Sequence, residues 1–173
     1  KDGSENNNFA FFIGGLQKYM PDSLLIFAPY ANSYRRFLSY WSSPVNLEWA
    51  IDNRSVGLRV PDSDPETRRI ENRLGGSDVN PYLALAATLA CGYLGMTEKI
   101  KPRDAIEGSA YDLPFGLHRH MYASIDAFSS SEAMRKVLGD AFVDMYAGIK
   151  QKEHEQFQEI ITPWEREHLM LNV

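Results

Sequence analysis

Arg69-Ile70-Glu71-Asn72-Arg73 is the stretch around which the rest of the chain is organised. In an extended backbone alternate side chains share one face, so Arg69, Glu71 and Arg73 would project together. Charge alternation of this kind is common on solvated strands. The five residues by themselves therefore favour a surface ladder of cross-strand ion pairs.

Two further extended segments are expected upstream. Ser55–Val60 alternates like a strand, with its apolar residues on one face and Arg59 on the other beside two small residues that leave room for the guanidinium. Val45–Ala50 also resembles a strand, and Asp52 and Asn53 predict a tight turn between the two. Residues 69–74 are expected to be a third extended segment, closed by Gly75 and Gly76.

The positive charge of this region is all arginine, because no lysine occurs between Lys18 and Lys99. A guanidinium is a planar fork that binds carboxylate or phosphate through two parallel hydrogen bonds. In a chain of net charge −5, such a cluster is better suited to a small anion than to nucleic acid. The arginines concerned are Arg36, Arg54, Arg59, Arg68, Arg69 and Arg73.

Composition predicts one globular domain without nucleic-acid or membrane partners. The 173 residues are 44% apolar and 24% charged, and the sequence pI is near 5.4. The longest apolar run, residues 82–96, is too short to span a bilayer. Cys91 is the single cysteine, which excludes an internal disulfide, and its apolar surroundings predict a buried, inert thiol.

Helices are expected before and after the strands along the sequence, so the predicted fold class is α+β. Phe9–Met20 and Ser23–Phe27 predict two short helices before the sheet. After it, Asn80 is a good N-cap for a helix that is apolar nearly all round and therefore buried on several sides, with Gly92 and Gly95 loosening or ending it.

The C-terminal third is predicted to be helical. Ser129 and Glu132 predict a capping box for a short helix that ends at Gly139, and residues 142–160 predict a long amphipathic helix. Thr162 and Glu165 predict a second capping box. His118-Arg119-His120 lacks helical spacing and a third ligand, so a solvated loop is favoured over a metal pair.

Five short motifs, in this order and spacing, together resemble the glutamine synthetase family. They are Asn32-Ser33-Tyr34-Arg35-Arg36, Asn53-Arg54-Ser55, Arg59-Val60-Pro61, Arg69-Ile70-Glu71-Asn72-Arg73 and Asn80-Pro81-Tyr82-Leu83. The resemblance implies a glutamine synthetase-type catalytic domain, with antiparallel strands backed by helices and a helical C-terminal region. It also implies that residues 1–173 are the C-terminal portion of that domain, with the β-grasp domain and most metal-binding carboxylates upstream, so that this segment alone would be inactive.

The resemblance assigns a role to each arginine. The family phosphorylates the γ-carboxylate of glutamate with ATP, and an amine then displaces the phosphate. By position, Arg36 and Arg73 resemble the arginines that hold glutamate. Arg54 and Arg59 resemble those that hold the transferring and nucleotide phosphates, with Arg54 acting in catalysis, and Arg69 resembles the arginine beside the base and sugar.

The same resemblance reverses the interpretation of Glu71. It resembles the carboxylate that binds the metal nearer to ATP, and hard oxygen ligands suit Mg²⁺ or Mn²⁺. The family also implies a cytoplasmic homododecamer of two stacked hexameric rings.

Three departures from the family pattern bear on the substrate. Ser42 stands where ammonia-using members place a catalytic glutamate, and residues 64–67 replace a family lysine. Tyr111 lies in a loop that resembles one adenylylated in some bacterial members, but different residues precede it. Together with the C-terminal residues 162–165, Ser42 favours a γ-glutamyl ligase whose acceptor is an amine or polyamine. An ammonia-using glutamine synthetase and a non-catalytic ligand-binding relative are the alternatives.

Overall fold

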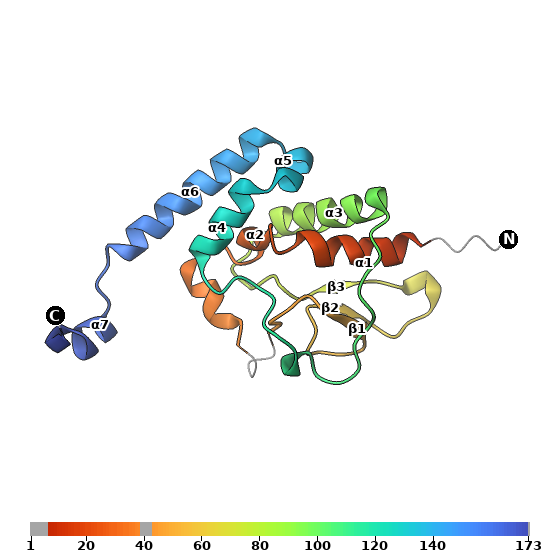
Figure 1. The fold of residues 1–173 in the computed structure, drawn as a ribbon, viewed down its shortest axis with the longest axis horizontal. Helices are drawn as coiled ribbons and strands as arrows, with labels where there is room; N and C mark the ends of the chain where they lie inside the picture. The colour runs from red at the N-terminus through yellow and green to blue at the C-terminus, as the bar shows by residue number, and fades with distance from the viewer. Residues whose placement is uncertain (1–6, 39–42, 173) are drawn as a thin grey trace.

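The computed structural model describes residues 7–38 and 43–172 (Figure 1). The fold is α+β, as expected: helices α1 (Asn8–Tyr19) and α3 (Pro81–Glu98) pack together over a small sheet. The C-terminal helices follow beside this layer and then lead away from it. A one-turn α-helix, α2 (Leu24–Phe27), follows α1. The 3₁₀ helices are η1 (Ala31–Arg36), η2 (Pro65–Thr67), η3 (Ala110–Asp112) and η4 (Met170–Asn172).

The sheet has the order β1-β2-β3, formed by Trp49–Ile51, Leu58–Val60 and Glu71–Asn72. β2 and β3 are antiparallel, and Arg59 lies opposite Glu71. β1 and β2, however, are parallel. The antiparallel pairing that the expected tight turn at residues 52 and 53 and the family resemblance both implied is therefore wrong for β1 and β2.

The reason lies in the connection between β1 and β2. Asp52 adopts a left-handed conformation with φ of +50°. The Asn53 carboxamide oxygen then accepts hydrogen bonds from the backbone N–H of Ser55 at 2.9 Å and from its hydroxyl at 2.6 Å. Asn53 also donates to the carbonyl of Gly108 at 2.6 Å. This local turn, held from outside by the loop at Gly108, redirects the chain so that β2 enters the sheet in the same direction as β1.

Glycines allow α1 and α3 to pack backbone against backbone. A Cβ on Gly15 would lie 2.6 Å from the Cα of Gly95, and a Cβ on Gly92 would lie 2.1 Å from the ring of Phe12. Gly92 and Gly95 thus serve the contact with α1, and α3 continues through both of them to Glu98. The expectation that Gly92 and Gly95 loosen or end this helix is wrong.

The N-terminus of α3 begins as predicted. The side chain of Asn80 accepts hydrogen bonds from the N–H groups of Tyr82 at 3.0 Å and Leu83 at 3.2 Å. The apolar composition of this helix predicted that it would be buried on several sides. Tyr82 and Leu85 are nevertheless exposed, so part of its apolar surface faces solvent. Within the described residues α3 packs mainly against α1, with smaller contacts to α2 and α5.

The C-terminal helices are α4 (Met121–Ser130), α5 (Glu132–Leu138), α6 (Asp140–Gln158) and α7 (Pro163–His168). The N-cap of α5 is Ser131, whose hydroxyl accepts from the N–H of Met134 at 3.3 Å. The predicted cap, Ser129, lies in the last turn of α4, a helix that the sequence pattern did not predict. The capping box at Thr162 is confirmed.

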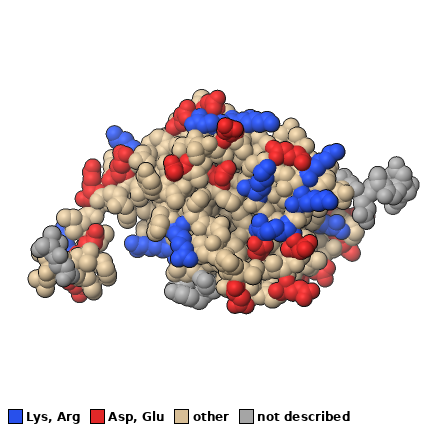
Figure 2. All heavy atoms as spheres, viewed as in Figure 1, with Lys and Arg blue, Asp and Glu red and all other residues tan. Residues whose placement is uncertain are grey.

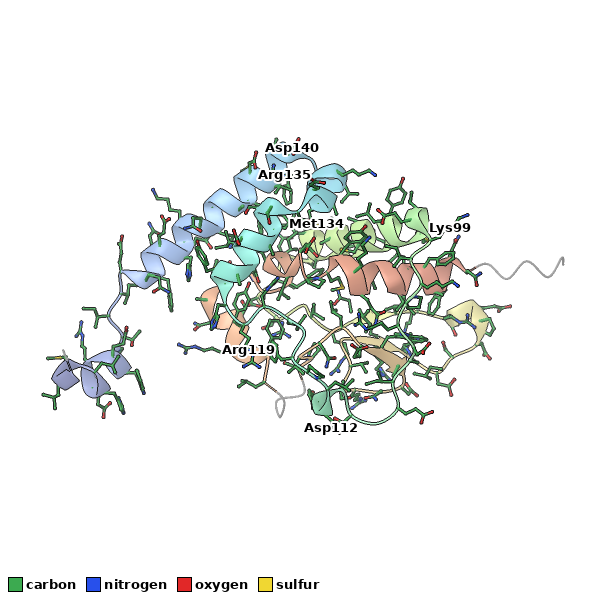
Figure 3. The ribbon with its side chains drawn as sticks, viewed as in Figure 1. Lys99, Asp112, Arg119, Met134, Arg135 and Asp140 are labelled. Carbon is green, nitrogen blue, oxygen red and sulfur yellow. The ribbon has the colours of Figure 1, made fainter. Side chains whose placement is uncertain are left out.

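Arg135 joins three of these helices (Figure 3). Its guanidinium donates to the carbonyl of Ser129 at 2.7 Å and forms ion pairs with Asp140 at 3.2 Å and Asp144 at 2.7 Å. It thereby caps the last turn of α4 and fixes the first turns of α6. Beyond α6 the chain extends away from the body to α7 (Figure 1). No helix in the described ranges is long and apolar enough to cross a bilayer.

Candidate active site

Arg59 and Glu71 form the centre of the candidate site. One guanidinium nitrogen of Arg59 donates to both carboxylate oxygens of Glu71, at 2.9 and 2.8 Å, and the other donates to Asp52 at 2.6 Å. The hydrogen bond to Glu71, supported by that to Asp52, raises the pKa of Arg59 above its ordinary value. The sheet register produces the pair directly, because the two residues face each other across β2 and β3.

Arg73 leaves the end of β3 and reaches back across the β1–β2 connection. Its guanidinium donates to the carbonyls of Arg54 and Val56, the latter at 3.1 Å. Its backbone N–H donates to the carbonyl of Gly57 at 3.0 Å. Arg73 therefore holds the segment that carries Arg54, whose own side chain is exposed.

Arg36, in η1, approaches the segment that follows β3. Its guanidinium donates to the carbonyl of Leu74 and lies 4.6 Å from the centre of the Phe37 ring. Its Nε is buried and has no hydrogen-bond acceptor among residues 7–38 and 43–172. Burial lowers the pKa of Arg36, and the charge of Asp78 partly opposes this effect. A guanidinium with an unused donor is suited to bind a carboxylate.

The other predicted residues are not drawn into this contact network. Arg69 is exposed and lies just before β3, which is shorter than the predicted strand. Ser42 lies outside the described residues. The hydroxyl of Tyr111 is buried and has no hydrogen-bond partner in the described part of the chain.

Glu71 fits the role of one metal ligand among several. Its side chain is about one-third exposed, at 36%. The described residues contain no group of three or more histidine, cysteine, aspartate or glutamate side chains that could hold a metal ion together, and His118 and His120 join no such group. Mg²⁺ is commonly bound by one or two carboxylates, with phosphate and water oxygens completing its shell. The donor set fits that arrangement.

Sequence reasoning missed two acidic residues of this region, Asp52 and Asp78. The sequence pattern predicts only a turn at Asp52, yet its carboxylate forms the second ion pair of Arg59, beside that with Glu71. Asp78 lies beside Arg36 and accepts a hydrogen bond from Ser33. Neither has a local sequence signal, because both partners are brought close by the fold. On the face shown in Figure 2, basic and acidic side chains are interspersed and do not form a basic stripe.

Comparisons with known proteins find similar sequences and a similar fold. The γ-glutamylputrescine synthetase PuuA of Escherichia coli strain K12 is 32% identical over 174 residues, which cover 99% of this chain and 36% of that protein. The glutamate–isopropylamine ligase of a Pseudomonas species is 35% identical over 158 residues, covering 89% and 34%. The type-1 glutamine synthetase 2 of Dictyostelium discoideum is 34% identical over 168 residues, covering 94% and 32%.

A solved structure shares the fold. A GmaS/ADP complex superposes with a TM-score of 0.85 at 26% identity, covering 100% of this chain and 42% of that one. The chain spans about a third of the length of the curated relatives named above. The family described as glutamine synthetase, catalytic domain, matches residues 1–169. The chain therefore belongs to the glutamine synthetase catalytic domain family.

Proposed function

We propose that this chain forms one wall of the active site of an ATP-dependent γ-glutamyl ligase, which phosphorylates the γ-carboxylate of glutamate and joins it to an amine or polyamine. One observation carries the proposal: Arg73 directly follows β3, Arg36 reaches the carbonyl of the next residue, Leu74, and the Arg59–Glu71 pair lies at β3 itself. Phosphoryl transfer depends mainly on charge neutralisation and positioning, which such an arrangement provides.

Each arginine then has a defined task. Arg36 and Arg73 bind the carboxylates of glutamate. Arg54 and Arg59 bind the phosphates of ATP, and Arg54, whose exposed side chain is carried by a segment that Arg73 holds, stabilises the charge that develops on the transferring phosphoryl group. Arg69 contacts the base and sugar from its exposed position before β3.

Glu71 would hold a Mg²⁺ or Mn²⁺ ion together with phosphate oxygens and water. The ion would neutralise charge on the nucleotide phosphates. Arg59 prepares the site, because its guanidinium binds both carboxylate oxygens of Glu71 and orients that carboxylate across the sheet. Among the described residues, Glu71 is the one metal ligand that we propose, so we expect residues 1–173 to show no ligase turnover by themselves.

The choice of acceptor rests on Ser42 and on the relatives. A glutamate at this position could attract ammonium and accept a proton, whereas a serine is neither charged nor basic near neutral pH. The names of two relatives, γ-glutamylputrescine synthetase and glutamate–isopropylamine ligase, favour an alkyl amine. Ammonia is the second candidate, supported by the similarity to the type-1 glutamine synthetase.

The test is a coupled ATPase assay on the full-length protein with glutamate, Mg²⁺ and a panel of putrescine, isopropylamine and ammonia. We expect glutamate-dependent turnover that is fastest with a primary amine or polyamine. Arg73→Lys, which keeps the charge but loses the fork, should lower kcat/KM for glutamate at least about tenfold. Arg166→Lys in α7 is the matched control and should have no effect.

Two results would contradict the proposal. An absence of ATP turnover with every acceptor in the full-length protein would remove the ligase assignment. A higher kcat/KM for ammonia than for every amine would leave the ligase but reverse the acceptor. Ser42→Glu should shift the ratio toward ammonia if the reasoning about Ser42 is correct.

A further inference from the structure

The hydroxyl of Ser33 joins two segments that lie 45 residues apart in sequence. It accepts a hydrogen bond from the backbone N–H of Tyr30 at 3.1 Å and donates one to Oδ2 of Asp78 at 2.5 Å. Ser33 is buried, with 4% of its surface exposed. Asp78 is exposed, so the contact fixes the buried hydroxyl of η1 against a carboxylate on the surface of the segment between β3 and α3.

Arg36 lies three residues after Ser33 in the same 3₁₀ helix. Because side chains at i and i+3 eclipse in a 3₁₀ helix, both project toward the same side. Their contacts agree with this geometry: Ser33 binds Asp78, and Arg36 donates to the carbonyl of Leu74, four residues earlier in the same segment. One helix face thus carries both the attachment to residues 74–78 and the guanidinium.

Gly76 lies between the carboxylate and the guanidinium. A Cβ at this position would lie 2.4 Å from Oδ1 of Asp78 and 3.2 Å from Nε of Arg36. The absence of a side chain allows both groups to approach the same point of the backbone. The charge of Asp78 also acts on Arg36, since it opposes the lowering of the Arg36 pKa by burial.

We propose that Asp78 is a positioning residue, which holds Arg36 in place through Ser33 and through its own charge facing the guanidinium across Gly76. This inference rests on the proposed role of Arg36 in binding a carboxylate of glutamate. Without the hydrogen bond between Ser33 and Asp78, η1 can shift relative to residues 74–78. The Arg36 guanidinium, which donates to the carbonyl of Leu74, is then no longer held in one orientation. The lost geometry should appear in glutamate binding and not in ATP binding.

The experiment uses two variants and one control in the full-length protein. Ser33→Ala removes the hydrogen bond and keeps the charge, whereas Asp78→Asn keeps an acceptor and removes the charge. Asp104→Asn changes an exposed carboxylate in the loop that follows α3 and serves as the control. We expect each of the first two to raise the KM for glutamate about tenfold, the effect of losing one charge-assisted hydrogen bond, with the KM for ATP within about twofold.

A second readout does not depend on activity. The Nε–Hε signal of Arg36 in ¹⁵N NMR, assigned by its loss in Arg36→Lys, should exchange slowly with water in the unmutated protein because Nε is buried. Both variants should accelerate this exchange, and Asp104→Asn should not. Unchanged exchange in Ser33→Ala and Asp78→Asn would overturn the inference, whatever the kinetics show.

The two proposals fail in different ways. If the unmutated protein hydrolyses no ATP with glutamate, the proposed function is wrong, and the NMR comparison still decides whether Asp78 positions Arg36. If Asp78→Asn does not fold, as judged by its thermal unfolding, Ser33→Ala decides alone, since it removes a single hydroxyl group. An increase in both KM values together would indicate a general structural effect and would also overturn the positioning role.

Discussion

Arg59 and Glu71 face each other across the antiparallel pair β2–β3, with one guanidinium nitrogen 2.8 and 2.9 Å from the two carboxylate oxygens. The pair is partly exposed, since 19% of the Arg59 side chain and 36% of the Glu71 side chain reach solvent. Partly exposed ion pairs contribute little to folding because water screens them. We therefore expect the pair to contribute little to the stability of the fold.

Substitution of Glu71 should lower enzymatic activity without lowering the stability of the fold. Glu71→Gln removes the proposed metal ligand, and the full-length enzyme should lose about 100-fold or more of its metal-dependent ATP turnover. Its thermal unfolding midpoint should remain close to that of the unmutated protein. Asp52→Asn is the matched control, because it removes the other carboxylate on Arg59 and should change turnover only a few-fold. Equal losses in the two variants would argue against a metal role for Glu71.

Alanine substitutions at two glycines should change stability in opposite directions: Gly95 lies in the contact between α1 and α3, whereas Gly148 lies in α6. A Cβ on Gly95 would lie 2.2 Å from the carbonyl oxygen of Phe11 and 2.5 Å from the Cα of Gly15, so Gly95→Ala should destabilise the protein by about 3 kcal/mol or more. Gly148 in α6 has no atom within 4 Å of its Cβ position. Gly148→Ala should therefore stabilise the protein by about 0.5–1 kcal/mol through helix propensity. Urea unfolding of both variants measures the difference.

Cys91 predicts a loss of stability at alkaline pH. Burial raises the pKa of its thiol from 9.0 to about 12, so the folded state keeps a proton that the unfolded chain releases above pH 9. Stability conferred by the protonated thiol is complete below pH 9 and is lost as the pH rises toward 12, by about 2 kcal/mol between pH 8 and pH 10.5. Burial raises the pKa values of Tyr34 and Tyr146 as well, which acts in the same direction above pH 10.

Urea unfolding at pH 8 and pH 10.5 tests this prediction. Cys91→Ala should be less stable at pH 8, because it leaves a cavity, yet it should lose less stability between the two pH values. The same decrease in both proteins would show that the thiol does not contribute to the pH dependence.

The C-terminal segment predicts an effect on assembly. Trp164, Met170 and Leu171 are exposed on and after α7, and Leu171 is 96% exposed. Apolar side chains in such a position are typical of a surface that another subunit covers. If the full-length protein forms two stacked hexameric rings, deletion of residues 169–173 should weaken their stacking and lower the mass measured by light scattering. Glu167→Gln is the control, and an unchanged mass after the deletion would contradict the prediction.

Sequence predicted best those features whose partners are close along the chain. Asn80 and Thr162 cap their helices as expected, because a cap bonds N–H groups two or three residues away. The same rule failed at Ser129, since Ser131 offers an equivalent hydroxyl and lies at the start of α5. The Arg-x-Glu-x-Arg motif indicated the position of the site and, through the family resemblance, its chemistry.

The sequence by itself therefore determined the α+β class, the starts of α3 and α7, and the arginine-rich region that resembles a ligase site. Only the tertiary structure decided the parallel pairing of β1 and β2, the continuity of α3 through Gly95, and the attachment of η1 to Asp78. Each of these depends on atoms far apart in sequence: Gly108 against Asn53, Gly15 against Gly95, and Ser33 against Asp78. Local propensity carries no information about such partners, because their free energy arises only when the fold brings them into contact.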